Sequence, residues 1–250
     1  MRYSYALQGQ ESAAVVSFAI FTVAYGVYHF IFISEGIKRH FSIRWGDERG
    51  SFYQVLLSRG VFAALAAVVP IILLWTVFDI SPAMVGLTFS QSNWSLSRTL
   101  LWVVIVSCIA GSILWFSRKT PRLLAAYPQM RLKRWSFLDI LLNVVSWALY
   151  LFAYETMFRG YLLITIMPAG LWVAIAVNTA LYVAVHLPKG FQESFGSAFY
   201  GPIVCVLSLE SGTLWIVLVS HFAVAMANSF SNLRANSDMH FVFRREKRST

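Results

Sequence analysis

The chain has 250 residues, of which 58% are hydrophobic and 12% are charged. Soluble domains are about half apolar and about a quarter charged, so this composition excludes an ordinary soluble protein and indicates a polytopic membrane protein. The net charge of +9 does not point to a nucleic-acid partner, because the basic residues are sorted between loops in the way that orients a membrane protein.

Seven apolar runs are candidate membrane helices, some of them shorter than the roughly 20 residues that a membrane-spanning helix prefers. The first run is too long for the apolar core of a cleaved signal peptide, so we expect it to be retained. An eighth helix could lie in the long first loop. We therefore predict an all-α polytopic bundle of about seven or eight transmembrane helices around a polar cavity. The runs are residues 13–34, 61–78, 99–117, 137–167, 169–186, 195–209 and 213–230.

The basic residues predict how the chain is oriented. Most of them fall in segments that share one side of the membrane if the N-terminus is outside, and loops on the inner side are enriched in Lys and Arg. We therefore predict that the N-terminus lies outside and the C-terminus inside. The segments that hold the basic residues are 35–60, 118–136, the turn at Lys189 and the chain after Asn232.

Local signals mark where several helices begin and end. Ser136 followed by Asp139 predicts the start of a helix, because these side chains can satisfy free backbone amides there. Pro168 predicts the end of the same helix. Pro70 and Pro202 lie inside apolar runs and predict kinks or breaks.

Four ionisable side chains lie in runs that are otherwise apolar enough to cross a bilayer: Glu155, Arg159, His186 and His221. A charged side chain in hydrocarbon costs several kcal/mol or more unless it is paired or faces water, so such residues mark a functional site by default. Glu155 and Arg159 are four residues apart, which places them on one face of a helix and predicts an ion pair. That pair alone could be structural.

Depth in the membrane groups several polar residues. A rise of about 1.5 Å per residue, counted from the outer turns of the later helices, places four of them in the inner half of the membrane. We therefore expect them to reach one polar cavity. Each of them alone is more often a packing or hydrogen-bonding residue, as we expect for His29 in the first run. The four residues are Glu155, His186, His221 and Asn228.

Three motifs follow one another in the second half of the chain. They are Glu155-Thr-Met-Phe-Arg-Gly160, Tyr182-Val-Ala-Val-His186, and Gly212-Thr-Leu-Trp followed by His221. Their order and spacing resemble those of the CAAX-protease and bacteriocin-processing family, also called CPBP or Abi proteins, over residues 137–230. We therefore divide the chain into N-terminal membrane helices with basic inner loops (1–136), family-like core helices (137–231) and a basic C-terminal tail (232–250).

The resemblance implies a fold, an activity and a location. The family's fold is an all-helical membrane bundle around a polar cavity, and its active members are intramembrane endopeptidases, among them enzymes that trim prenylated CAAX proteins. For this chain the resemblance implies a membrane-associated protein or peptide as the substrate and the bacterial inner membrane as the location. The expected partners are that substrate and the lipid bilayer, and no nucleic acid is expected.

The resemblance also implies roles for individual residues. Glu155 and Arg159 correspond to the second Glu and the Arg of the family's Glu-Glu-x-x-x-Arg motif. His186 closes the Phe-x-x-x-His motif, in which Tyr182 replaces the Phe, and His221 opens the final His-x-x-x-Asn motif. Whether the family uses a metal or a glutamate-activated water is left open by the resemblance.

Two positions depart from the family's pattern. The first Glu of the motif is Tyr154 here, and the residue four positions after His221 is Ala225 rather than Asn. A tyrosine is a poor general base near neutral pH, because its ordinary pKa is about 10. If Glu155 is paired with Arg159, its carboxylate is also a weaker base than a free one.

Three functions are therefore considered. The first, which we expect, is an intramembrane endopeptidase in which Glu155 and His186 activate water while His221 and Asn228 stabilise the tetrahedral anion. The second is a catalytically degenerate family member that acts as a membrane scaffold or binds a partner. The third is a transporter or proton relay, although the chain has no inverted repeat. The cofactor is open: two His and one Glu can bind zinc, but their scattered spacing is a weak signal.

Overall fold

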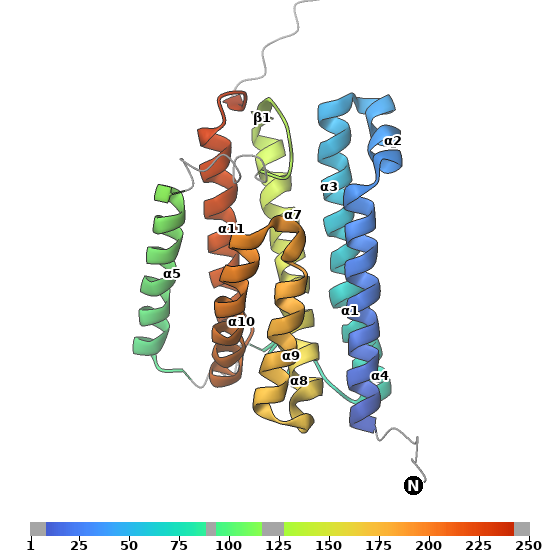
Figure 1. Ribbon diagram of the computed structural model, residues 1–250, viewed down its shortest axis with the longest axis vertical. Coiled ribbons are helices and arrows are strands. Elements are labelled where there is room, and N and C mark those ends of the chain that lie inside the picture. Colours follow the sequence, from blue (N-terminus) through green and yellow to red (C-terminus); the bar gives the residue numbers. More distant parts are fainter. Residues whose placement is uncertain (1–8, 89–93, 117–127, 243–250) are drawn as a thin grey trace, which may run out of the picture. The chain divides into compact units, whose positions relative to one another are not determined.

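The computed structural model describes residues 9–88, 94–116 and 128–242, and helices dominate these ranges (Figure 1). Two short strands, β1 (Arg134–Ser136) and β2 (His240–Val242), pair in parallel. Residues 243–250 of the predicted basic tail lie outside the described residues. The helices are α1 (Gly9–Ile33), α2 (Glu35–Trp45), α3 (Asp47–Ala63), the π-helical η1 (Ala64–Val68), α4 (Val69–Phe78), α5 (Leu96–Phe116), α7 (Phe137–Glu155), the π-helical η3 (Thr156–Leu162), α8 (Leu163–Ile166), the 3-10 helix η4 (Met167–Ala169), α9 (Leu171–Ala184), the 3-10 helix η5 (Leu187–Lys189), α10 (Phe191–Ser211) and α11 (Trp215–Ala235).

Helices form in all seven of the apolar runs predicted from the sequence. Within the described residues, five helical stretches are long and apolar enough to cross a membrane. The prediction of an all-α polytopic membrane fold is therefore confirmed. The apolar stretch found in α5 is shorter, at Ser97–Ile109. The five stretches are Glu11–Ile33, Asp47–Phe78, Phe137–Ala169, Leu171–Lys189 and Trp215–Ala235.

The second of these helical stretches begins at Asp47, well before the apolar run that starts at residue 61. Its polar first half is helical because its polar side chains are buried with partners. The Gln54 amide, for example, donates hydrogen bonds to the backbone carbonyls of Ile31, at 2.9 Å, and Ser34, at 2.8 Å. Hydropathy alone could not predict this half of the helix, because it scores Gln, Ser and Arg as solvent-facing residues.

The prolines act differently from one another. Pro168 lies in η4 and is followed by Gly170 with a φ of 118°, so the predicted end of the helix is confirmed. Pro70, in contrast, is the second residue of α4 and follows the π-helical η1 without a break. Pro202 lies inside α10. Neither Pro70 nor Pro202 ends its helix, and an altered turn such as η1 can accommodate the missing proline N–H.

The contacts divide the chain into two compact units. Unit 1 comprises Met1–Val27, Val61–Thr99 and Leu151–Val219, and unit 2 comprises Tyr28–Gly60, Leu100–Tyr150 and Ser220–Thr250. The three-part division along the sequence is not tested by these units and stays a prediction. In unit 1, α9 packs against both α8 and α10.

Two glycines let a loop and a helix approach closely inside unit 1. Gly86 has a φ of 82°, and a Cβ atom there would lie 3.2 Å from the backbone nitrogen of Leu214. That nitrogen donates a 2.9 Å hydrogen bond to the Gly86 carbonyl. Gly160 faces the same place, since a Cβ atom on it would lie 3.4 Å from side-chain atoms of Leu214 and Val85. The glycines therefore bring the loop after α4, η3 and the start of α11 together.

Unit 2 is organised around a buried arginine in α3. Arg59 is 1% exposed, and its guanidinium donates to Asn143 at 3.2 Å and to Ser146 at 2.8 Å, both in α7. It also donates to Gln129 at 2.8 Å and lies 4.0 Å from the centre of the Trp147 ring. Oriented neutral oxygens and an aromatic face thus replace the water that this cation would otherwise bind.

The predicted start of α7 is confirmed by reciprocal capping. The Asp139 backbone N–H donates to the Ser136 hydroxyl at 3.3 Å, and the Ser136 backbone N–H donates to the Asp139 carboxylate at 2.9 Å. Arg49 of α3 pairs with the same carboxylate through both of its terminal nitrogens. The start of α7 is thereby tied to α3 inside unit 2.

Replacing Ser136 by alanine removes the hydroxyl that satisfies an N-terminal amide of α7. We expect Ser136→Ala to lower the free energy of unfolding by about 1 kcal/mol. Unfolding of the detergent-purified protein, followed by circular dichroism, measures this change. Ser51→Ala is the matched control, because Ser51 is half-buried within α3 and has no recorded hydrogen bond to its hydroxyl. Equal stability of the two variants would contradict the capping role.

Candidate functional site

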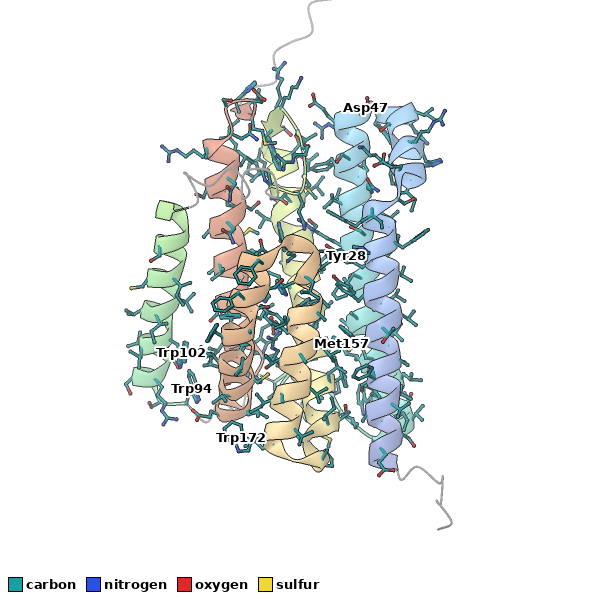
Figure 2. The ribbon with its side chains drawn as sticks, viewed as in Figure 1. Tyr28, Asp47, Trp94, Trp102, Met157 and Trp172 are labelled. Carbon is teal, nitrogen blue, oxygen red and sulfur yellow. The ribbon has the colours of Figure 1, made fainter. Side chains whose placement is uncertain are left out.

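The candidate site forms where α7 changes into a π-helix. Glu155 is the last residue of α7, and the seven residues of η3, Thr156–Leu162, are all buried. Met157, which Figure 2 labels in this segment, is 0% exposed. Single π-helical turns inside α-helices occur frequently at functional sites. The first motif recognised in the sequence therefore coincides with a change of helix geometry.

The predicted ion pair between Glu155 and Arg159 is confirmed. The distance from Arg159 Nη1 to Glu155 Oε2 is 3.2 Å, and the two side chains are 0% and 1% exposed. The guanidinium carbon also lies 4.3 Å from the centre of the Tyr182 ring and 5.4 Å from that of Phe158. The pair is therefore shielded from water by aromatic rings, and removal of one partner would leave the other charge buried alone.

Tyr154, at the position of the family's first Glu, is part of this aromatic cluster. Its side chain is buried, at 3% exposure. The Tyr154 ring stacks on Phe158 at 4.4 Å and meets Tyr182 edge-on at 5.9 Å, measured between ring centres. The Phe62 ring of α3 lies 6.3 Å away. The position that carries a carboxylate in the family motif therefore packs an aromatic ring in this chain.

Two polar side chains from α9 and α10 connect to η3. Asn178 is 0% exposed, and its amide donates a 2.5 Å hydrogen bond to the Phe158 carbonyl. The Cys205 thiol donates to the Asn178 side-chain oxygen at 3.3 Å. Because π-helical geometry rearranges the backbone hydrogen bonds, a side-chain partner for the Phe158 carbonyl stabilises this segment. The sequence places Asn178 eight positions before His186, but it does not predict the contact of Asn178 with η3.

His186 lies just beyond the C-terminal end of α9. Its Nδ1 atom is 2.7 Å from the backbone carbonyl of Tyr182, and its ring centre is 4.5 Å from that of Tyr182. A carbonyl only accepts hydrogen bonds, so Nδ1 carries the proton and Nε2 holds the lone pair of the neutral ring. His186 is 8% exposed, whereas Glu155 is 1% exposed. In the neutral ring, the contact of Nδ1 with the carbonyl therefore selects the tautomer whose Nε2 carries the lone pair.

Tyr25 of α1 is a site residue that sequence reasoning missed. Its hydroxyl donates a 2.9 Å hydrogen bond to the carbonyl of Val185, the residue before His186. That carbonyl belongs to the C-terminal end of α9, where backbone acceptors have no partner within the helix. Tyr25 and Val185 are 160 residues apart, and no motif or periodicity in the sequence links them.

The third motif begins in unit 1 and continues into unit 2. In unit 1, the Trp215 ring stacks on Phe152 of α7 at 6.3 Å, and the Thr213 hydroxyl donates to the Thr88 carbonyl at 3.0 Å. His221 and Asn228 are partly buried residues of α11 that belong to unit 2. Contacts inside unit 1 therefore connect Tyr154, Glu155, Arg159, Tyr182 and His186. The grouping of His221 and Asn228 with these residues stays a prediction.

His, Cys, Asp and Glu side chains are the groups of this chain that could bind a metal ion. Within the residues that the structure describes, no group of three or more His, Cys, Asp or Glu side chains is placed to hold a metal ion. Protein zinc sites normally use three or four such ligands. The zinc ligands considered from the sequence are Glu155 and His186 in unit 1 and His221 in unit 2, so zinc binding stays a prediction.

Comparison with known families agrees with these motifs. Residues 133–227 match the family model described as Rce1-like, type II CAAX prenyl endopeptidase Rce1-like. This part of the chain is similar to that family. The match includes Glu155, Arg159, His186 and His221 and ends one residue before Asn228, so the family resemblance is confirmed. Searches of curated proteins and of solved structures found no match. The chain is thus an integral membrane protein with a CAAX-protease-like segment.

The buried ion pair predicts strong coupling between its two members. We expect Arg159→Met to lower the free energy of unfolding by about 3–5 kcal/mol, because Glu155 then remains buried without its counterion. Removing both charges, as Glu155→Gln with Arg159→Met, should cost less than the sum of the single changes. Unfolding of the detergent-purified variants measures the coupling.

Lys189 and Glu193 offer the matched control for this cycle. They are also four residues apart and 3.7 Å from each other, but their side chains are 31% and 21% exposed. We expect Lys189→Met to cost less than about 1 kcal/mol, because water and salt screen a partly exposed pair. Additive effects at Glu155 and Arg159 would contradict the interpretation of a tightly coupled pair.

Proposed function

We propose that this chain is an intramembrane endopeptidase that cleaves a membrane-associated protein or peptide. Three observations support the proposal. The matched family is described as a prenyl endopeptidase, its motif residues Glu155, Arg159 and His186 are buried in unit 1, and the His186 ring is held in one tautomer. The charge distribution of the loops favours an N-terminus outside and a C-terminus inside, and the resemblance favours a bacterial inner membrane.

His186 is the general base in this proposal, and its tautomer is the single observation that carries it. A water molecule gives a proton to Nε2 while its oxygen bonds to the carbonyl carbon of the scissile peptide. The C–N bond of the tetrahedral intermediate then breaks, and the proton passes from Nε2 to the leaving amine nitrogen. Nδ1 keeps its proton and donates it in a hydrogen bond to the Tyr182 carbonyl throughout, which keeps the ring oriented.

Glu155 takes a positioning role rather than the role of water activator that the sequence suggested. Its carboxylate neutralises Arg159 at 3.2 Å, and the guanidinium packs on the Tyr182 ring at 4.3 Å. The Tyr182 backbone in turn holds His186. By the motif resemblance, His221 and Asn228 are assigned to the stabilisation of the tetrahedral anion.

A catalytically degenerate member is the second candidate function. Tyr154 favours it, because this residue fills the position of the family's first Glu with a ring that packs on Phe158 at 4.4 Å. In that case the same buried cluster stabilises a scaffold that binds a membrane partner without cleaving it.

Cleavage of a peptide library by the detergent-purified protein tests the endopeptidase. We expect wild-type cleavage, detected by mass spectrometry, and a loss of about 100-fold or more in His186→Ala, because a general base contributes about 10²–10⁴-fold. His29→Ala is the matched control, since His29 lies in α1 outside all motifs. Folded wild-type protein without cleavage would contradict the proposal and favour the scaffold. A parallel assay with chelator tests for a required metal, and loss of activity would contradict the metal-free mechanism.

Tyr25 should act on catalysis through His186 rather than on substrate binding. Tyr25→Phe removes only the hydroxyl that bonds the Val185 carbonyl, a contact worth about 1 kcal/mol. We expect kcat to fall about fivefold with little change in KM, because the backbone that positions His186 becomes looser. Tyr53→Phe, on a half-buried residue of α3 in unit 2, is the control. A change in KM alone would contradict the positioning role.

A further inference from the structure

α2 is a short helix with two chemically different faces, and none of its residues is buried. Ile37, Phe41 and Trp45 recur every fourth residue and therefore share one face. The Phe41 and Trp45 rings lie 6.2 and 4.8 Å from the ring of Tyr53 in α3, measured between ring centres. This apolar face is therefore the one that α2 directs toward α3 within unit 2.

The opposite face of α2 carries Arg39 and Ile43, which are four residues apart, and Arg44 lies about 100° around the helix from Ile43, nearer to Ile37. Ile43 is 80% exposed, and Arg39, His40 and Arg44 are also exposed. An isoleucine so exposed gains nothing in water, but it would be stabilised among lipid acyl chains. Arginine side chains on either side can extend toward phosphate groups while their apolar stems remain in contact with the lipid.

The charges around α2 leave these two arginines available. Glu35 lies 3.7 Å from Lys38, and Glu48 lies 3.9 Å from Lys133, so these two carboxylates are engaged with lysines. The structure records no ion pair of Arg39 or Arg44 with another described residue. Arg44 instead lies 4.9 Å from the centre of the Trp45 ring, which is itself 41% exposed. Figure 2 labels Asp47, which begins α3 next to α2 and is also exposed.

We propose that the exposed side of α2, which packs beside α3 (Figure 1), binds the phosphate groups of anionic lipids. Arg39 and Arg44 supply the charge and the paired N–H donors that suit phosphate oxygens, and Ile43 inserts between the acyl chains. Charge complementarity selects anionic over zwitterionic lipids. The site is entirely within unit 2 and independent of the endopeptidase proposal.

Trp45 provides a built-in reporter for the test. The detergent-purified full chain is titrated with short-chain phosphatidylglycerol, with phosphatidylcholine of the same chain length, and with inorganic phosphate. The fluorescence of a Trp45→Phe variant is subtracted to isolate the signal of Trp45. We expect saturable binding of phosphatidylglycerol that is about fivefold weaker in Arg39→Gln and in Arg44→Gln, since each basic residue contributes about 1 kcal/mol. Added salt should weaken it further.

Matched variants separate the two parts of the site. Ile43→Ser should weaken phosphatidylglycerol binding without removing the preference over phosphatidylcholine, because it removes only the inserted apolar group. Arg98→Gln, at an exposed arginine that pairs with Glu210, should bind like the wild type. Equal binding of both lipids, unchanged binding in both arginine variants, or equal competition by inorganic phosphate would each overturn the proposal.

Discussion

Unit 1 depends on a pair of opposite charges that lies wholly out of water. Glu155 and Arg159 are 3.2 Å apart with essentially no exposure, and aromatic rings surround them. Taking two ions out of water is costly, and the attraction between them repays that cost only when the geometry is good and their other contacts are satisfactory. Within unit 1, the Tyr182 ring covers this pair, and the Asn178 amide stabilises the backbone of η3 that carries Arg159.

The chain buries a second guanidinium, that of Arg59, with a different set of partners. Arg59 in unit 2 is held by the oxygens of Asn143, Ser146 and Gln129 and by the Trp147 ring. Several neutral dipoles can solvate a cation, but each must be oriented toward it. Arg159 has one carboxylate beside it instead. The difference fits the two roles: Arg59 connects helices, whereas Arg159 lies in the first family motif.

The sequence predicted the structural features that depend on residues close together along the chain. Apolar runs located the helices, Ser136 and Asp139 located the start of α7, and four-residue spacing gave the pair of Glu155 and Arg159. It could not predict η3, because a π-helical turn is stabilised by tertiary partners such as the Asn178 amide on the Phe158 carbonyl. Hydropathy also missed the first half of the second helical stretch, where Gln54 and its neighbours are buried with hydrogen-bond partners.

In the proposed endopeptidase, the choice of the general base follows from Tyr154, which stands where the family motif has its first Glu. In the family motif two adjacent carboxylates are available, so one can neutralise the arginine while the other contacts water. With Tyr154 packed on Phe158, the single carboxylate of Glu155 would have to do both, and it is already paired with Arg159 at 3.2 Å. A proton acceptor must then come from a group that is not engaged with a cation. His186 is the candidate within unit 1, because its Nδ1 atom lies 2.7 Å from the Tyr182 carbonyl, which leaves the lone pair of the neutral ring on Nε2.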